Sequence, residues 1–235
     1  MILGPPAMAF TEIDEAVAQL QAARGDERPV VLFWQYDVAA IPKGAVVYNF
    51  DLPIVHFSTD AMRVAAARAS EVWEFSERGL DAWRRIGVTA KHVPVGYHPS
   101  MTRFERREPD IDVVFSGSLN SRRWAVFQEL KRAGFSVALA PADRAVRDAL
   151  LARARASINM LFYPSGVYPV LRAAHLLAND VPYVGERCHG SEWDPTSGNF
   201  VDYDRLVDAT IARVEIGNGE GHKETFMSRP MVLPT

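Results

Sequence analysis

The sequence lacks the features that would place it outside the cell or across a membrane. Its 235 residues include one cysteine, Cys188, which excludes an internal disulfide and is typical of a reducing compartment. No apolar run approaches the ~20 residues that span a bilayer. The N-terminal MILGPPAMAF has no basic region before its apolar residues, unlike a secretory signal. We therefore expect a cytoplasmic protein without a transmembrane segment, and leave peripheral membrane association open.

An excess of charge of one sign is also absent. The chain has 26 Lys and Arg against 29 Asp and Glu, a formal net charge of −3, which argues against nucleic acid as the main partner. Hydrophobic residues make up 48% and charged residues 23%, both close to the averages of soluble globular proteins. The length suffices for one large domain or two small ones.

Several ligand-binding motifs are missing as well. There is no cluster of His and carboxylates with metal-ligand spacing, so we expect no metal and no cofactor. There is also no G-x-G-x-x-G, which disfavours a NAD(P)-linked enzyme, the weakest of three functional interpretations.

Strand-like and helix-like segments alternate along the chain. In the second half the predicted strands are Asp112–Gly117, Phe135–Ala140, Ser157–Tyr163 and Val181–Glu186. The predicted helices are Ser121–Gly134, Ala142–Ala156, Val167–Asp180 and Tyr203–Glu215. This alternation implies βαβ units in an α/β fold with a parallel sheet flanked by helices.

In the first half, strand-like and helix-like segments alternate less regularly. It contains apolar, strand-like runs within Arg28–Tyr36 and Gly44–Phe57, shorter strands at Glu71–Ser76 and Lys91–Gly96, and three helices that end near Gly25, Ser70 and Gly87. The polar stretch Tyr97–Pro109 is interpreted as the connection between domains. We therefore expect a reduced N-terminal domain over 1–96 and a second domain over 97–235.

Ligands of open parallel sheets bind beyond the carboxyl ends of the strands. Gly117 ends a predicted strand, and Ser118 and Asn120 follow it with small polar side chains, in a turn that exposes N–H groups at the start of a helix. Arg122 and Arg123 lie at that helix start, where the dipole disfavours cations. A bound diphosphate would explain them; the alternative is a pair of solvated surface arginines. Because the two charges would repel each other in an empty site, either Arg→Ala variant is expected to keep or raise the stability of the empty protein.

Two further segments lie at predicted strand ends. Ser165, Gly166 and Val167 precede the helix that carries Arg172, so backbone N–H groups and this guanidinium could reach a ligand; the alternative is an ordinary turn. Glu186 ends the last predicted strand and could accept hydrogen bonds from ribose or sugar hydroxyls. The alternative for Glu186 is a salt bridge with a neighbouring arginine.

Three motifs together resemble the group-1-type glycosyltransferases of bacterial polysaccharide clusters. They are the VPVGYHP passage, the F-x-G-S-L-N-x-R-R turn and the segment N-x5-S-G-x5-R-x3-L-L-A-N, within a match from about Glu71 to Glu186. The resemblance implies a GT-B architecture, with two facing Rossmann-like domains and the active site in the cleft between them. The C-terminal domain would hold the nucleotide-sugar donor, with Gly117, Ser118, Asn120, Arg122, Arg123, Ser165, Gly166, Val167, Arg172 and Glu186 as its binding residues.

The activity implied is transfer of a sugar from a nucleotide sugar to a glycan or lipid-linked acceptor in polysaccharide biosynthesis. Positive side chains and helix dipoles would neutralise the leaving diphosphate in place of a metal. An inverting mechanism needs a base in the N-terminal domain, and we select His56, with Asp37 and Asp51 as neighbouring candidates, for its ordinary pKa near neutrality.

One departure from the family favours a second interpretation. Many retaining members carry E-x7-E across the second loop, and Pro164 and Arg172 stand at those positions here. The alternative is therefore a catalytically inactive protein of the same fold that binds a nucleotide or a glycan.

Overall fold

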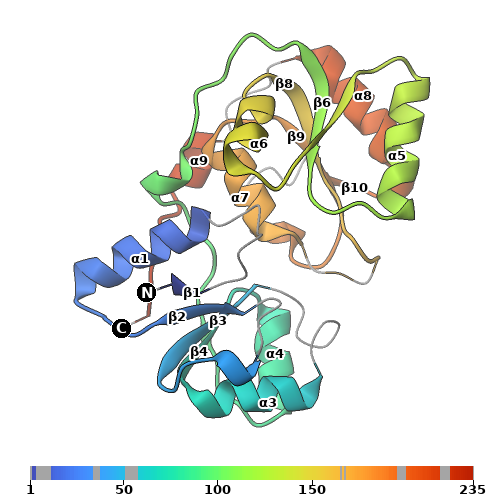
Figure 1. The fold of residues 1–235 in the computed structure, drawn as a ribbon. Coiled ribbons are helices and arrows are strands. Elements are labelled where there is room, and N and C mark those ends of the chain that lie inside the picture. The colour runs from blue at the N-terminus through green and yellow to red at the C-terminus, as the bar shows by residue number, and fades with distance from the viewer. Residues whose placement is uncertain are drawn as a thin grey trace. The chain divides into compact units, whose positions relative to one another are not determined.

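The computed structural model describes residues 2–3, 12–33, 38–50, 58–164, 166, 168–194, 200–217 and 223–234. The chain forms two compact units, Met1–Gly96 with Met231–Thr235, and Tyr97–Pro230. Each unit has a five-stranded parallel sheet with helices beside it (Figure 1), so the expected α/β class with parallel sheets holds. The last five residues cluster with the first unit, whereas the sequence analysis extended the second domain to Thr235.

The sheet of the first unit follows the order of the sequence, β1-β2-β3-β4-β5. Its strands are β1 (Ile2–Leu3), β2 (Val30–Phe33), β3 (Ala45–Asn49), β4 (Ala69–Glu74) and β5 (Lys91–His92), all parallel. Its helices are α1 (Glu12–Arg24), η1 (Val38–Ala40), α3 (Thr59–Arg68) and α4 (Glu77–Arg85). Ser58 and Ser76 begin α3 and α4 by accepting hydrogen bonds from the backbone N–H of Ala61 and Gly79.

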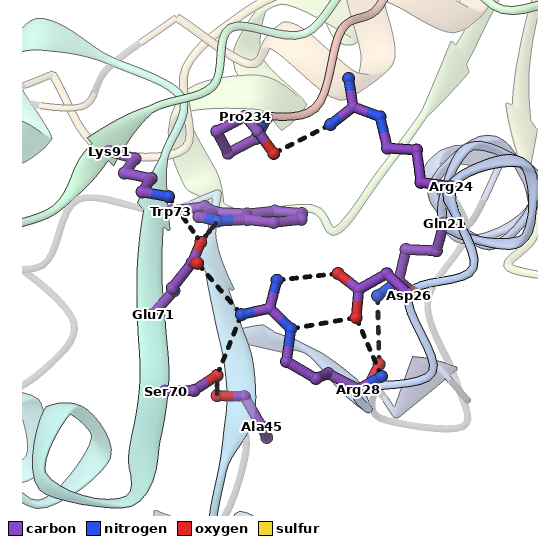
Figure 2. Close-up of polar contacts among 10 residues, drawn as sticks. All are labelled: Gln21, Arg24, Asp26, Arg28, Ala45, Ser70, Glu71, Trp73, Lys91 and Pro234. Carbon is purple, nitrogen blue, oxygen red and sulfur yellow. Dashed lines mark hydrogen bonds and ion pairs between the residues drawn. The ribbon is translucent and has the colours of Figure 1, made fainter.

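Ion pairs tie the amino ends of these strands together (Figure 2). Arg28, just before β2, donates to Asp26 at 2.8 Å and to Glu71 on β4 at 3.0 Å. Glu71 also accepts from Nε1 of Trp73 at 2.8 Å and pairs with Lys91 on β5 at 3.2 Å. This network therefore holds the approach to β2 against β4 and β5, at the edge opposite the carboxyl ends.

The C-terminal segment packs into the first unit. Met231 and Leu233 are 4% and 2% exposed, while Val232 between them is 61% exposed, the alternation of an extended segment with one buried face. Arg24 on α1 donates to the carbonyl of Pro234 at 2.8 Å (Figure 2). The segment is thus fastened by apolar burial and by one charge-assisted hydrogen bond.

The second unit has the strand order β10-β9-β8-β6-β7. Its strands are β6 (Ile111–Ser116), β7 (Val137–Ala140), β8 (Ala154–Asn159), β9 (Tyr183–Glu186) and β10 (Phe200–Val201), all parallel. Its helices are η2 (Pro99–Met101), α5 (Ser121–Arg132), α6 (Arg144–Leu151), α7 (Val170–Ala178), η3 (Ser191–Trp193), η5 (Tyr203–Arg205), α8 (Leu206–Ile216) and α9 (Lys223–Met227). Strands are present at all four places predicted for this half, although β8 covers Ala154–Asn159 where Ser157–Tyr163 was predicted. The short β10 and α9 were not predicted.

The predicted boundary between α6 and β8 is wrong. The helix predicted over Ala142–Ala156 ends at Leu151, and β8 already begins at Ala154. Arg155 is exposed and pairs with Asp112 at 3.4 Å, while Ala154 and Ala156 beside it are buried. This alternation is that of a strand, which the run of arginines and alanines concealed because both residue types favour helices.

The two faces of the second sheet differ in polarity. Val113, Phe115 and Ile158 pack with α5 and α8 in one apolar cluster, and α6 and α7 lie on the other face (Figure 1). Because side chains alternate along a strand, Ser116 and Asn159 point to the face of α6 and α7. The chain passes from β6 to β7 on one side and then to β8 on the other, so the topological switch point lies between β6 and β8.

Candidate functional site

The switch point gathers most of the residues predicted for the donor site. Gly117 follows β6, Asn120 begins α5, and Arg172 lies on α7, which follows β8. Glu186 is the last residue of β9, and Gly166 lies in the β8–α7 connection, where its N–H donates to the carbonyl of Tyr163 at 2.9 Å. Ser165, Val167 and the catalytic candidate His56, with Asp37 and Asp51, lie outside the described residues.

Asn120 connects the β6–α5 turn with the segment after β8, at the carboxyl edge of the second sheet. Its Oδ1 accepts from the backbone N–H of Arg123 at 2.9 Å, which caps α5, and its Nδ2 donates to the carbonyl of Phe162 at 2.6 Å. The small polar side chain therefore ties the β6–α5 turn to the segment that follows β8.

Arg123 is buried in this edge, with 3% of its surface exposed. Its guanidinium donates to the carbonyls of Ser118 at 2.6 Å, Met160 at 2.6 Å and Leu161 at 3.1 Å. Burial, followed by repulsion from Arg122, lowers the pKa of Arg123 to about 10. The interpretation as a solvated surface residue is therefore wrong for Arg123.

Arg122 forms a bidentate pair with Glu186. Its Nη1 lies 2.8 Å from Oε2, its Nη2 contacts Oε1, and its Cζ lies 3.8 Å from the ring centre of Tyr203. Glu186 also accepts from the backbone N–H of Leu161 at 2.9 Å and is 5% exposed. The structure thus shows the salt-bridge alternative for Glu186, and its oxygens already have protein partners.

Arg172 and Gly117 approach each other closely. Gly117 has φ +133°, and a Cβ there would lie 2.6 Å from Nη2 of Arg172. Nη1 of Arg172 donates to Oδ1 of Asn159 at 3.1 Å and to the carbonyl of Met160 at 3.3 Å. Burial, followed by repulsion from Arg123, lowers the pKa of Arg172 to about 9. Gly117 therefore has a φ that favours glycine and lies against the guanidinium of Arg172.

Two polar residues at this edge belong to the quoted motifs but were not among the predicted binding residues. Ser116 and Asn159 end the adjacent strands β6 and β8 and are fully buried. Among the described residues, Oγ of Ser116 and Nδ2 of Asn159 have no hydrogen-bond partner. Buried polar atoms without partners are rare and need an explanation. The signal that could have revealed them is a polar residue at the end of an apolar strand.

The same signal marks Glu74 in the first unit. Glu74 ends β4 and is fully buried, and its carboxylate accepts from Asn49 at 2.6 Å and from the hydroxyl of Ser76 at 2.9 Å. Nε1 of Trp83 donates to it at 3.1 Å. Burial raises the pKa of Glu74 to about 7 against the opposing effect of these hydrogen bonds. Glu74 therefore titrates near neutrality at the carboxyl edge of the first sheet.

Two further features bear on ligands and membranes. Within the described ranges, no three His, Cys, Asp or Glu residues lie close enough together to hold a metal ion. None of the described helices is both long and apolar enough to cross a bilayer.

Neither protein-family models nor curated proteins match this sequence. Among solved structures, the chain is similar to a chain of the Glycosylation Associate Protein (Gap123) complex from Streptococcus agalactiae, with a TM-score of 0.43 and 10% identity. The similarity covers 87% of this chain and 54% of that one, so this chain spans about half the length of that solved chain.

Proposed function

We propose that the second unit binds the diphosphate of a nucleotide sugar and that the protein is a GT-B glycosyltransferase, which transfers the sugar to a glycan or lipid-linked acceptor. The observation that carries this proposal is the convergence of Arg122, Arg123 and Arg172 at the switch point of a parallel sheet, where ligands of such sheets bind.

The electrostatics of the three arginines favour an anion. Besides burial, which is the larger cause, repulsion from Arg122 lowers the pKa of Arg123, and repulsion from Arg123 lowers that of Arg172, so the three guanidinium groups repel one another despite the Arg122–Glu186 pair. A diphosphate brings two to three negative charges and oxygen acceptors that suit guanidinium donors. Its arrival would relieve the repulsion and raise both pKa values.

The proposal assigns different tasks to the arginines. Arg123 has three backbone carbonyl partners, and Arg122 is paired with Glu186, so both mainly build the edge. Arg172 lies beneath Gly117 beside Asn159, and we assign to it the contact with the diphosphate. The sequence predicted that Arg122 and Arg123 bind the diphosphate together; the proposal now gives that contact to Arg172.

The test combines binding with turnover. Calorimetric titration of UDP, GDP, ADP, CDP and dTDP into the whole protein should show binding of at least one of them, and its sugar conjugate should be turned over when an acceptor glycan is supplied. Arg172→Met should weaken binding about ten- to a hundredfold, since a charge-assisted hydrogen bond contributes ~1.5–3 kcal/mol. Arg132→Met, at the exposed end of α5, is the control and should bind as the wild type does. Binding of none of the five nucleotides would overturn the proposal.

One observation favours an inactive binding protein as the second candidate. A guanidinium, Arg172, stands where retaining members of the resembling family carry the later Glu, and it is 7% exposed beside Asn159. Tight nucleotide binding, without turnover of any nucleotide sugar, would select this candidate over the transferase.

A further inference from the structure

Two exposed apolar side chains flank the arginines of the second unit. Leu119, in the β6–α5 turn, is 41% exposed, and Tyr163, after β8, is 44% exposed. Large apolar side chains that gather at one place on a surface mark binding sites more often than those that lie singly. Their position beside a cationic edge raises the question of which ligand combines an apolar and an anionic part.

Hydrogen bonds hold the two loops against each other on both sides of Leu119. The carbonyl of Ser118 accepts from Arg123 at 2.6 Å, and Nδ2 of Asn120 donates to the carbonyl of Phe162 at 2.6 Å. Arg123 also donates to the carbonyl of Leu161 at 3.1 Å. The turn that bears Leu119 is therefore fixed beside the segment that bears Tyr163.

Ring contacts link Tyr163 to the arginines. The guanidinium of Arg123 lies 5.1 Å from the ring centre of Phe162, and the rings of Phe162 and Tyr163 are 4.7 Å apart in an edge-to-face arrangement. Phe162 thus packs against the Tyr163 ring, while 44% of Tyr163 stays exposed. A supported and exposed aromatic ring is suited to stacking against a planar ligand.

We propose that Tyr163 stacks on the base of the bound nucleotide and that Leu119 supplies apolar contact beside it. The inference rests on the proposed function, because it assigns the base of the same ligand whose diphosphate lies at Arg172. A nucleoside diphosphate has one planar apolar part and one polyanionic part, which matches this pairing of aromatic and cationic groups. Stacking tolerates any base, so the proposal sets no preference among the five nucleotides.

The test separates the base from the diphosphate. Pyrophosphate and the tightest-binding nucleoside diphosphate are titrated calorimetrically into the wild type, Tyr163→Ala and Tyr163→Phe. Tyr163→Ala should weaken nucleoside diphosphate binding about ten- to a hundredfold, the effect of losing one base–aromatic stack, and should leave pyrophosphate binding within about twofold. Tyr163→Phe keeps the ring and should bind as the wild type does.

Trp124→Ala is the matched control. Trp124 is an aromatic residue of similar exposure, 43%, in the same unit, but Lys131 lies over its ring at 6.0 Å. This variant should bind both ligands as the wild type does, and thermal unfolding confirms that each variant is folded.

Three outcomes would overturn the inference in distinguishable ways. If Tyr163→Ala binds the nucleoside diphosphate as strongly as the wild type does, Tyr163 does not stack on the base, and the proposed function is unaffected. If Tyr163→Ala weakens the binding of pyrophosphate and of the nucleotide equally, Tyr163 maintains the structure of the loop and does not contact the base. If the wild type binds neither ligand, the proposed function fails as well.

Discussion

Replacement of Arg123 by Ala distinguishes a ligand-binding arginine at the surface from one that builds the edge of the sheet. The sequence predicts that loss of this charge beside a helix N-terminus keeps or raises the stability of the empty protein. The structure predicts the opposite, because Arg123 is 3% exposed and donates to three backbone carbonyls.

The magnitude follows from two opposing terms. Burial, followed by repulsion from Arg122, lowers the pKa of Arg123 to about 10 and so disfavours its charged form by ~3 kcal/mol. Three charge-assisted hydrogen bonds contribute ~1.5–3 kcal/mol each in the other direction. After truncation, the carbonyls of Leu161 and Met160 keep Arg122 and Arg172 as donors, while that of Ser118 loses Arg123. The balance of these two contributions is a net loss of ~1.5–6 kcal/mol, and because two of the three carbonyls keep a donor we expect about 2–4 kcal/mol.

The assay is thermal and urea unfolding of the empty protein. In a chain of this size, ~1 kcal/mol shifts Tm by about 2–4 °C, so Arg123→Ala should lower the transition of the second unit by roughly 4–16 °C. Arg132→Ala, exposed at the other end of α5, should stay within about 0.5 kcal/mol of the wild type. Unfolding of Arg123→Ala at or above the wild-type temperature would refute the assignment of Arg123 to the framework.

Three other predictions follow from close contacts and from titration. Gly117→Ala should lower stability by ~1–3 kcal/mol and weaken nucleoside diphosphate binding, because its Cβ would lie 2.6 Å from Nη2 of Arg172 at a φ of +133°. Gly79→Ala should lower stability by a similar amount, because the new Cβ would lie 2.0 Å from Cδ of Glu74. The loss should outweigh the ~1 kcal/mol by which Ala favours a helix over Gly, and urea unfolding measures it. Burial raises the pKa of Glu74 to about 7 in the folded state, so the stability that its protonated form contributes is complete below about pH 4.5 and is lost as the pH rises through 7. Urea unfolding between pH 5 and 8 should show this loss.

Matched variants control these three measurements. Gly134→Ala also has a positive φ but no atom within 4 Å of the new Cβ, so it isolates backbone strain from the contact at Gly117. Arg85→Ala, exposed on α4, should leave stability nearly unchanged, unlike Gly79→Ala. Glu74→Gln cannot titrate, so its stability should lack the fall towards pH 7; an unchanged fall would assign the titration to another group. Equal losses in Gly134→Ala and Gly117→Ala would contradict a role for the Arg172 contact.

The sequence by itself determined the class of fold. Apolar runs such as DVVFS and VPYVG, separated by helices with polar faces, predict buried parallel strands, and β6 and β9 lie where these runs predict them. The rule that ligands bind at the carboxyl ends of such strands then selected Gly117, Asn120, Arg172 and Glu186 without coordinates. Strands as short as β1 and β10 carry too few residues for a periodic signal.

Only the tertiary structure decided what each of these residues contacts. The pairing of Arg122 with Glu186, and the burial of Arg123 against carbonyls that follow β8, join residues from different strands and helices. The strand order, which places β8 beside β6, is likewise a non-local property. Local patterns report which face of a helix or strand is apolar, whereas the partners of a long polar side chain depend on how those elements pack. The sequence therefore selected the candidate residues, and the packing of β6, β8 and α7 determined which of them contact one another.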